Sequence, residues 1–201
     1  MNHWRGRSMY SQRDEEKFIL AAFAGKTDGR FLDVGAWDGE IFSNTRALAL
    51  AGWSGVLIEP SRIPCAKLRQ LYNGSGAVII EAAAGSQNGS THLWESDDAI
   101  STTQRSHFDR WKHHAEYHSY RLVEQVDLSE IIQRHGPFDF VSIDTEGTSV
   151  DLFTGIEWSP APRLICVEDD QRYKAVLEHG KRFGYRELHR TAENLILICE
   201  Q

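Results

Sequence analysis

Residues 31–40, FLDVGAWDGE, form the stretch of sequence that decides the fold. An apolar run at residues 31–34 is followed by two glycines, Gly35 and Gly39, and then by a helical pattern that ends at Leu50. A strand that passes through a glycine turn into a helix is typical of doubly wound α/β folds, which bind nucleotide-like ligands at this turn. The stretch therefore predicts both such a fold and a ligand site.

The alternation of strand and helix continues along the chain. Further apolar strand-like runs are expected at residues 55–59, 77–80, 138–143, 164–167, 185–189 and 195–199. Amphipathic helices between apolar strands indicate a parallel sheet covered on both faces. Because the last two runs are separated only by a short turn, they predict a hairpin with one antiparallel strand. We therefore expect an α/β, Rossmann-like fold with a mixed, mostly parallel seven-stranded sheet and helices on both faces.

The composition is that of an ordinary globular chain, with 201 residues, 41% of them hydrophobic and 25% charged. We expect one domain over residues 1–201, in which residues 1–29 form an N-terminal arm and helix. The alternation fails at residues 97–121, which we interpret as a lid-like insertion over the ligand site. This insertion carries four histidines within residues 107–118, so a metal site is one interpretation. The spacing of Phe108, Trp111 and Ala115 favours instead a solvated helix that docks on the body of the protein.

Charge and hydropathy limit the partners. The net charge is −7, from 22 Lys and Arg against 29 Asp and Glu, so no nucleic-acid partner is expected, since phosphate binding requires clustered basic residues. No apolar run approaches the ~20 residues of a membrane-spanning helix. The three cysteines show no CxxC spacing and are expected to be reduced. We expect a cytoplasmic protein without membrane contact, and its oligomeric state stays open.

Charges around the glycine turn distinguish between adenosine-containing ligands. Glu59 follows the second strand, 20 residues after Gly39, where a carboxylate can accept hydrogen bonds from both hydroxyls of a ribose. Asp33, Asp38 and Glu40 would repel a pyrophosphate in a poorly solvated crevice. The GxxxG spacing also departs from the GxGxxG of dinucleotide sites. S-adenosylmethionine carries an ammonium and a sulfonium, so the charges favour this methyl donor over NAD.

Other donor contacts are expected close to the turn. The hydroxyls and amide of Ser43, Asn44 and Thr45 suit the carboxylate of the donor, although ordinary helix capping explains them equally well. Residues 81–85, EAAAG, are small enough to lie against a flat adenine. The residues expected to bind the donor are Asp33, Gly35, Ala36, Trp37, Asp38, Ser43, Asn44, Glu59 and Ala83.

A second group of carboxylates follows the strand expected at residues 138–143. Asp144 and Glu146 should lie at the same sheet edge as Glu59, because parallel strands end together. A carboxylate there can orient an acceptor hydroxyl and take its proton, a role worth about 10²–10⁴-fold in rate. Asp144 is thus the first expected catalytic residue and Glu146 the second, with helix capping as the structural alternative. Asp144 and Asp169 could also hold Mg²⁺, but no histidine or asparagine at a diagnostic spacing favours this.

A series of short motifs in this order resembles the FkbM-type S-adenosylmethionine-dependent methyltransferases. They are DVGAWDG at 33–39, SNT at 43–45, GWSG at 52–55 with IEP at 58–60, and IDTEG at 143–147. The similarity covers most of residues 30–85 and 137–200, whereas residues 97–121 depart from it. The resemblance implies a class I methyltransferase fold and transfer to oxygen, typically a hydroxyl of a sugar or polyketide.

Three functions are weighed on these observations. The leading hypothesis is an S-adenosylmethionine-dependent O-methyltransferase acting on a hydroxyl of a small molecule or glycan. A nicotinamide-dependent oxidoreductase on a Rossmann-like fold is the first alternative, and the GxxxG spacing counts against it. The second alternative is a non-catalytic module that binds S-adenosylmethionine, against which the set of Asp33, Glu59 and Asp144 weighs.

Overall fold

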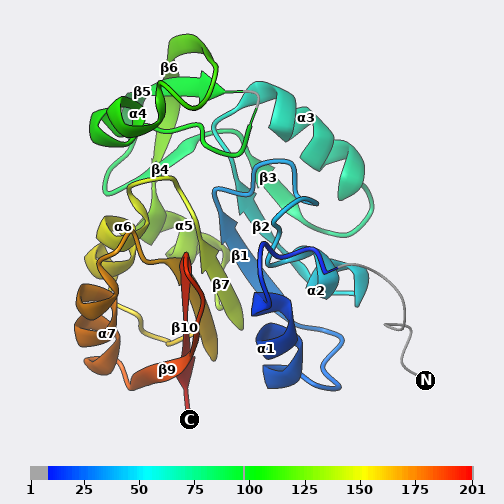
Figure 1. Ribbon diagram of the computed structural model, residues 1–201. Coiled ribbons are helices and arrows are strands. Elements are labelled where there is room, and N and C mark those ends of the chain that lie inside the picture. The colour runs from blue at the N-terminus through cyan, green and yellow to red at the C-terminus, as the bar shows by residue number, and fades with distance from the viewer. Residues whose placement is uncertain (1–8, 97, 201) are drawn as a thin grey trace.

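The main sheet of the protein has seven strands, and the computed structural model describes residues 9–96 and 98–200. The spatial order of the strands is β3-β2-β1-β7-β8-β10-β9, and β10 alone runs antiparallel to its neighbours β8 and β9 (Figure 1). The strands are β1 (Arg30–Val34), β2 (Ser54–Ile58), β3 (Val78–Ile80), β7 (Phe140–Ile143), β8 (Leu164–Glu168), β9 (Tyr185–Arg190) and β10 (Asn194–Cys199). The expected mixed, mostly parallel sheet is therefore confirmed.

Helices cover both faces of this sheet, as expected. One face carries α1 (Glu15–Ala22), α2 (Arg46–Leu50) and α3 (Arg62–Leu71), and the other carries α5 (Leu128–His135), α6 (Ser149–Gly155) and α7 (Tyr173–Lys181). Among the described residues, no helix has the length and apolar character needed to span a bilayer. Cys65, Cys166 and Cys199 are buried free thiols.

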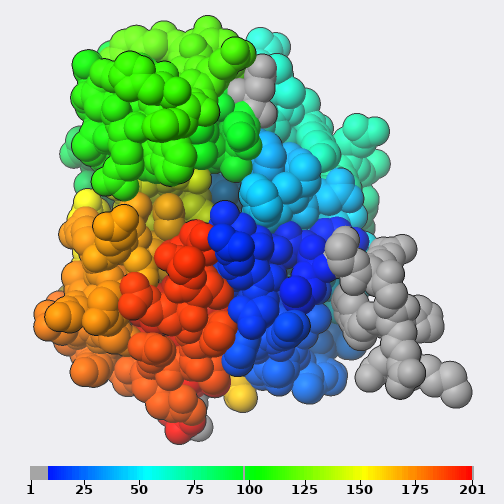
Figure 2. Space-filling view, in the orientation of Figure 1, coloured from blue at the N-terminus to red at the C-terminus, as the bar shows by residue number. Residues whose placement is uncertain are grey.

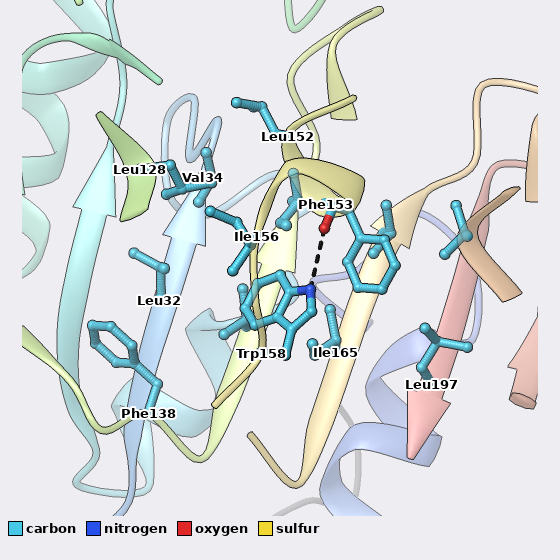
Figure 3. Packing of buried hydrophobic residues seen from close by; sticks show 14 of the residues in the cluster. Leu32, Val34, Leu128, Phe138, Leu152, Phe153, Ile156, Trp158, Ile165 and Leu197 are labelled. Carbon is cyan, nitrogen blue, oxygen red and sulfur yellow. Dashed lines mark hydrogen bonds between the residues drawn. The ribbon is translucent and has the colours of Figure 1, made fainter. Parts of the chain in front are cut away.

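Two hydrophobic cores lie on the two sides of the sheet because successive strand residues point to opposite faces. Leu32 and Val34 of β1 belong to the core under α5, α6 and α7, and Phe31 belongs to the core under α1, α2 and α3. In the first core, Trp158 Nε1 donates a hydrogen bond to the carbonyl of Phe153 at 3.1 Å (Figure 3). The buried indole thus keeps a partner for its one polar atom.

A second, three-stranded sheet stands beyond the carboxyl ends of the main strands (Figure 1). It is formed by β4 (Ala83–Gly85), β5 (Gly89–Ser96) and β6 (Tyr117–Asp127), in the order β4-β6-β5, and α4 (Arg105–Trp111) lies between β5 and β6 in the chain. Of the lid-like insertion expected at residues 97–121, the last part belongs to strand β6, and residue 97 itself lies outside the described residues. In the space-filling view this green part of the chain stands above a recess in the body (Figure 2).

The sequence pattern of β6 explains why the sequence does not predict this strand. Tyr120 and Leu122 are 56% and 60% exposed, whereas Arg121 lies on the covered side. Arg121 Nε donates to Glu95 Oε2 at 2.9 Å and its Nη2 donates to the carbonyl of Pro60 at 3.0 Å. At residues 120–122 the apolar and charged positions are thus exchanged relative to an ordinary half-buried strand.

The helix expected within residues 107–118 is shorter than its histidine pattern suggests. α4 ends at Trp111, whose side chain is 38% exposed, so the expected docking of Trp111 is wrong. Phe108 does pack, with its ring stacked 5.2 Å from that of Trp94. Ala115 lies beyond the helix. Of the expected N-terminal arm, residues 1–8 lie outside the described residues, and Ser11 is buried and pairs with Phe42 through a β-bridge.

Candidate active site

The parallel strands bring their carboxyl ends to one edge of the main sheet. Val34 at the end of β1 lies level with Ile58 of β2 and with Ile143 of β7. The residues that follow these ends include Gly35, Glu59 and Asp144. The topology thus places the glycine turn between the two expected acidic groups.

The glycine turn is held directly against the neighbouring strands. The N–H groups of Gly35 and Ala36 both donate to the carbonyl of Ile58, at 2.9 and 3.1 Å. Gly35 has φ +83°, and a Cβ at this position would collide with the backbone carbonyl of Asp144. Trp37 also has a positive φ, of 43°. Gly35 is therefore required both by its own backbone conformation and by the close approach of the backbone at Asp144.

Two adjoining hollows lie on either side of this turn. The Glu59 hollow is lined by Ile58, Glu59, Leu93 and the alanines at 82–84. The Asn44 hollow is lined by Asp33, Ser43, Asn44, Ser142 and Phe42, among others. Both hollows also share the residues Gly35, Trp37, Ala99, Asp144 and Glu146.

Residues 98–103 bring the second sheet's connecting segment over both hollows. Ser101 and Thr103 line the Glu59 hollow, and Asp98 and Ile100 line the Asn44 hollow. Thr102 Oγ1 donates to the carbonyl of Glu146 at 2.6 Å and so ties this segment to the sheet edge. The site is consequently enclosed by two separate parts of the chain.

Glu59 is buried, with both carboxylate oxygens held by the backbone. The N–H of Trp37 donates to Oε2 at 3.0 Å, and the N–H of Ser61 donates to Oε1 at 2.7 Å. Burial raises the pKa of Glu59 to about 7 against the opposing effect of these hydrogen bonds, and the charge of Glu95 raises it further. Since each carboxylate oxygen has a second lone pair, the oriented group can still accept a hydrogen bond at each oxygen.

Asp33 and the 43–45 triplet form a connected polar group on the other side of the turn. Thr45 Oγ1 donates to Asp33 Oδ2 at 2.5 Å, and burial raises the pKa of Asp33 to about 6. Asn44 Nδ2 donates to Ser142 Oγ at 3.1 Å, which leaves Asn44 Oδ1 buried without a hydrogen-bond partner among the described residues. Ser43 Oγ accepts from the N–H of Arg46 at 3.1 Å, as in helix capping. Thus Asn44 presents an acceptor, not a donor.

Asp38 is not brought to the hollows. Its Oδ2 lies 2.7 Å from Lys67 Nζ, and its Oδ1 accepts from the N–H groups of Glu40 and Ile41, both at 2.8 Å. These contacts hold the pKa of Asp38 below its usual range, although burial opposes them. Lys67 on α3 therefore neutralises part of the charge that the sequence assigns to the crevice.

Asp144 and Glu146 do lie together, in a cluster with Glu168 that we call the carboxylate cluster. Potential ligand oxygens of the three residues lie within 4.8 Å of one another. Burial, and next the charge of Glu146, raises the pKa of Asp144 to about 8. Burial also raises the pKa of Glu146, and it raises that of Glu168 well above its usual range with the charge of Asp144 adding to the effect.

Three residues in or near this cluster differ from the sequence expectation. Asp169, considered with Asp144 as a possible Mg²⁺ ligand, is instead paired elsewhere, because its Oδ2 accepts from Arg190 Nε at 2.9 Å. Glu168 takes its place because Val167 is level with Ile143, so the next residue on each strand points the same way. His107 was missed as well: its Nε2 lies 3.1 Å from Glu146 Oε2. The strand register signals Glu168, whereas nothing near His107 in sequence signals its place.

The strand order, the glycine turn and the acidic residue after β2 define a Rossmann-like S-adenosylmethionine-dependent methyltransferase fold. Residues 33–192 match the Methyltransferase FkbM domain, and the chain belongs to this family. The family membership favours methyl transfer over the oxidoreductase alternative. No match is found among curated proteins.

A solved structure shows the same fold at low sequence identity, and two further structures are more distantly similar. A crystal structure of methyltransferase FkbM from Methylobacillus flagellatus KT is 15% identical with a TM-score of 0.59, and covers 94% of this chain and 48% of its own. The present chain thus spans about half the length of that protein. A TehB-like SAM-dependent methyltransferase from Corynebacterium glutamicum is 13% identical with a TM-score of 0.49, covering 98% of this chain and 90% of its own. An O-methyltransferase from Bacillus cereus in complex with SAH is 12% identical with a TM-score of 0.44, and the match covers 96% of this chain and 84% of the other.

Proposed function

We propose that the protein transfers a methyl group from S-adenosylmethionine to a hydroxyl of a small molecule or glycan. The observation that carries the proposal is the pair of hollows that meet at Gly35, one containing Glu59 and the other Asn44, with Asp144 and Glu146 lining both. When bound, S-adenosylmethionine supplies a methyl group on a positively charged sulfur. The residues on either side of Gly35 suit the two halves of this donor.

The Glu59 hollow fits the adenosine half. The second lone pairs of the Glu59 oxygens suit the two ribose hydroxyls, because the N–H groups of Trp37 and Ser61 already fix the carboxylate. Ile58, Leu93 and the small side chains at 82–84 offer apolar surface to an adenine ring. Ala83 keeps the role expected for it in this proposal.

The Asn44 hollow fits the amino-acid half, with a polarity that differs from the sequence expectation. Asn44 Oδ1 receives no hydrogen bond from the described part of the chain, and Asp33 lies in the same hollow. Both groups accept hydrogen bonds, so they suit the α-ammonium of the donor and not its carboxylate. An ammonium there would satisfy the buried oxygen, whose desolvation otherwise costs about 1–3 kcal/mol.

The carboxylate cluster suits the acceptor. Asp144 and Glu146 line both hollows, so an acceptor hydroxyl held by them lies near the junction at Gly35. Most of the rate enhancement then comes from orienting this oxygen toward the methyl carbon. As the oxygen–carbon bond forms and the carbon–sulfur bond breaks, an ionised carboxylate of the cluster takes the hydroxyl proton. Asp144 is the first candidate for this role and Glu146 the second.

Donor binding is expected to strengthen as the pH rises through about 7. Only the ionised form of Glu59, whose pKa burial raises to about 7, offers acceptor lone pairs to both ribose hydroxyls, so binding favours loss of its proton. The affinity should fall up to about tenfold per pH unit below 7 and level off above 8. Calorimetric titration with S-adenosylhomocysteine from pH 5.5 to 8.5 measures this slope. The same slope in Glu59→Gln would assign the pH dependence to another group.

Ligand binding and labelled methyl transfer test the function itself. We expect calorimetry to detect S-adenosylhomocysteine and to detect no binding of NAD. Incubation with methyl-labelled S-adenosylmethionine and a panel of sugars, glycans and polyketides should label a hydroxyl oxygen. Donor binding without transfer to any member of the panel would favour the non-catalytic module, and transfer to nitrogen or carbon would contradict the proposed acceptor.

A further inference from the structure

The carboxylate cluster concentrates negative charge at the junction of the hollows. Asp144 follows β7, Glu168 ends β8 and Glu146 lies in the loop before α6, and potential ligand oxygens of the three lie within 4.8 Å of one another. Among the described residues, no lysine or arginine forms an ion pair with any of the three. Ser149 Oγ donates to Glu168 Oε2 at 2.8 Å, which orients this carboxylate without neutralising it. Within the described part of the chain, the cluster therefore has no lysine or arginine to offset its charge.

A buried histidine provides a second, independent observation. His107 on α4 is 7% exposed, and its Nε2 has no hydrogen-bond partner among the described residues. This nitrogen lies 3.1 Å from Glu146 Oε2, so it is directed into the cluster without completing a hydrogen bond. A buried polar atom without a partner is rare in folded proteins and calls for an occupant of its site.

The distances in the cluster are close to those around a small divalent ion. Neighbouring ligands of an octahedral ion with bonds of about 2.1 Å lie about 3.0 Å apart, and opposite ligands about 4.2 Å apart. The contact between His107 Nε2 and Glu146 Oε2 has the first of these separations. The carboxylate oxygens lie within 4.8 Å of one another, so side-chain adjustment about the ion would bring them to these separations.

We propose that Asp144, Glu146 and Glu168, together with Nε2 of His107, bind one divalent cation of the Mn²⁺ and Mg²⁺ class. Carboxylates suit both ions, and the imidazole ligand favours Mn²⁺ over Mg²⁺. The cation connects α4, which lies above the site, to the edge of the main sheet. Its relevance to catalysis rests on the proposed function, because a hydroxyl bound to it would lose its proton more readily. Binding of the ion itself does not depend on the proposed function.

Calorimetric titration of the chelator-treated full chain with MnCl₂ tests the site. We expect one Mn²⁺ per chain, and a rise in Tm of about 5 °C or more when free Mn²⁺ exceeds its Kd a hundredfold. Glu168→Gln should weaken Mn²⁺ binding at least about tenfold, since loss of even an outer partner of a metal ligand costs that much. Gln has the shape of a protonated Glu, so this variant should fold. His107→Ala should also weaken binding.

Glu187→Gln is the matched control, because Glu187 lies exposed on β9. It should bind Mn²⁺ as the unchanged chain does. Absence of Mn²⁺ binding at millimolar concentration, or equal affinity in Glu168→Gln, would overturn the proposal. Titration with S-adenosylhomocysteine in parallel separates this outcome from failure of the proposed function. Binding of S-adenosylhomocysteine without binding of Mn²⁺ would contradict only the metal site. Binding of Mn²⁺ without binding of S-adenosylhomocysteine would contradict only the methyltransferase proposal.

Discussion

Substitution of Gly35 with alanine is expected to abolish measurable binding of S-adenosylhomocysteine and to lower the free energy of unfolding by about 2–4 kcal/mol. Two effects combine at this position. An L side chain at φ +83° costs about 1–2 kcal/mol. In addition, the new Cβ would collide with the carbonyl of Asp144, which belongs to the backbone and cannot turn away. The ends of β1 and β7 must therefore separate, and with them the junction of the two hollows.

Gly25→Ala is a matched control for this experiment. Gly25 has nearly the same φ, +84°, but a Cβ there would meet nothing within 4 Å. This variant should lose only the backbone contribution, about 1–2 kcal/mol, and should bind S-adenosylhomocysteine normally. Urea unfolding and calorimetry measure the two quantities. If both alanine variants behave alike, the contact with Asp144 has no role in the site.

Much of the main sheet could be predicted because its signals are local and redundant. Buried parallel strands are continuous apolar runs, such as VLI in β2 and LICV in β8, and α5 both begins at a cap and ends at a glycine. Asp127 accepts from the N–H of Ser129 as a cap should, for example. The second sheet carries no such signal. In β6, Arg121 occupies a covered position because it has a specific acid, Glu95, to pair with, and a pairing between distant residues is invisible to periodicity.

The candidate site likewise contains some residues whose positions the sequence predicts and others whose positions it does not. Parallel strands end at a common edge, so the positions of Glu59 and Asp144 follow from counting residues along each strand. Asp38 follows the same logic, yet its carboxylate pairs with Lys67 on α3 and lines neither hollow. Asp169 and Glu168 are neighbours in sequence, and only the register of β8 against β7 decides which of them joins Asp144. His107 depends on how α4 folds back over the sheet, which no local pattern encodes.

Glu59→Gln is expected to weaken binding of S-adenosylhomocysteine by about 100-fold. The substitution keeps the size of the side chain but removes its charge, and a hydrogen bond to a charged group contributes about 1.5–3 kcal/mol. The surroundings increase the effect. Because Trp37 N–H and Ser61 N–H each point at one carboxylate oxygen, the NH₂ of a glutamine would face another donor in either orientation. The side chain must then turn away from the ribose position.

Glu81→Gln serves as the control for this prediction, because Glu81 follows the adjacent strand β3 as Glu59 follows β2. Its Oε2 lies 2.8 Å from Arg69 Nη2, and it does not line the Glu59 hollow. Removal of its charge tests whether any strand-end carboxylate attracts the donor through long-range charge alone, and we expect a change of less than about threefold, since exposed charges are screened. If Glu59→Gln binds within threefold of the unchanged chain, Glu59 does not hold the ribose. An equal loss in both variants would instead mean that the field of the sheet edge, and not two fixed hydrogen bonds, selects the donor.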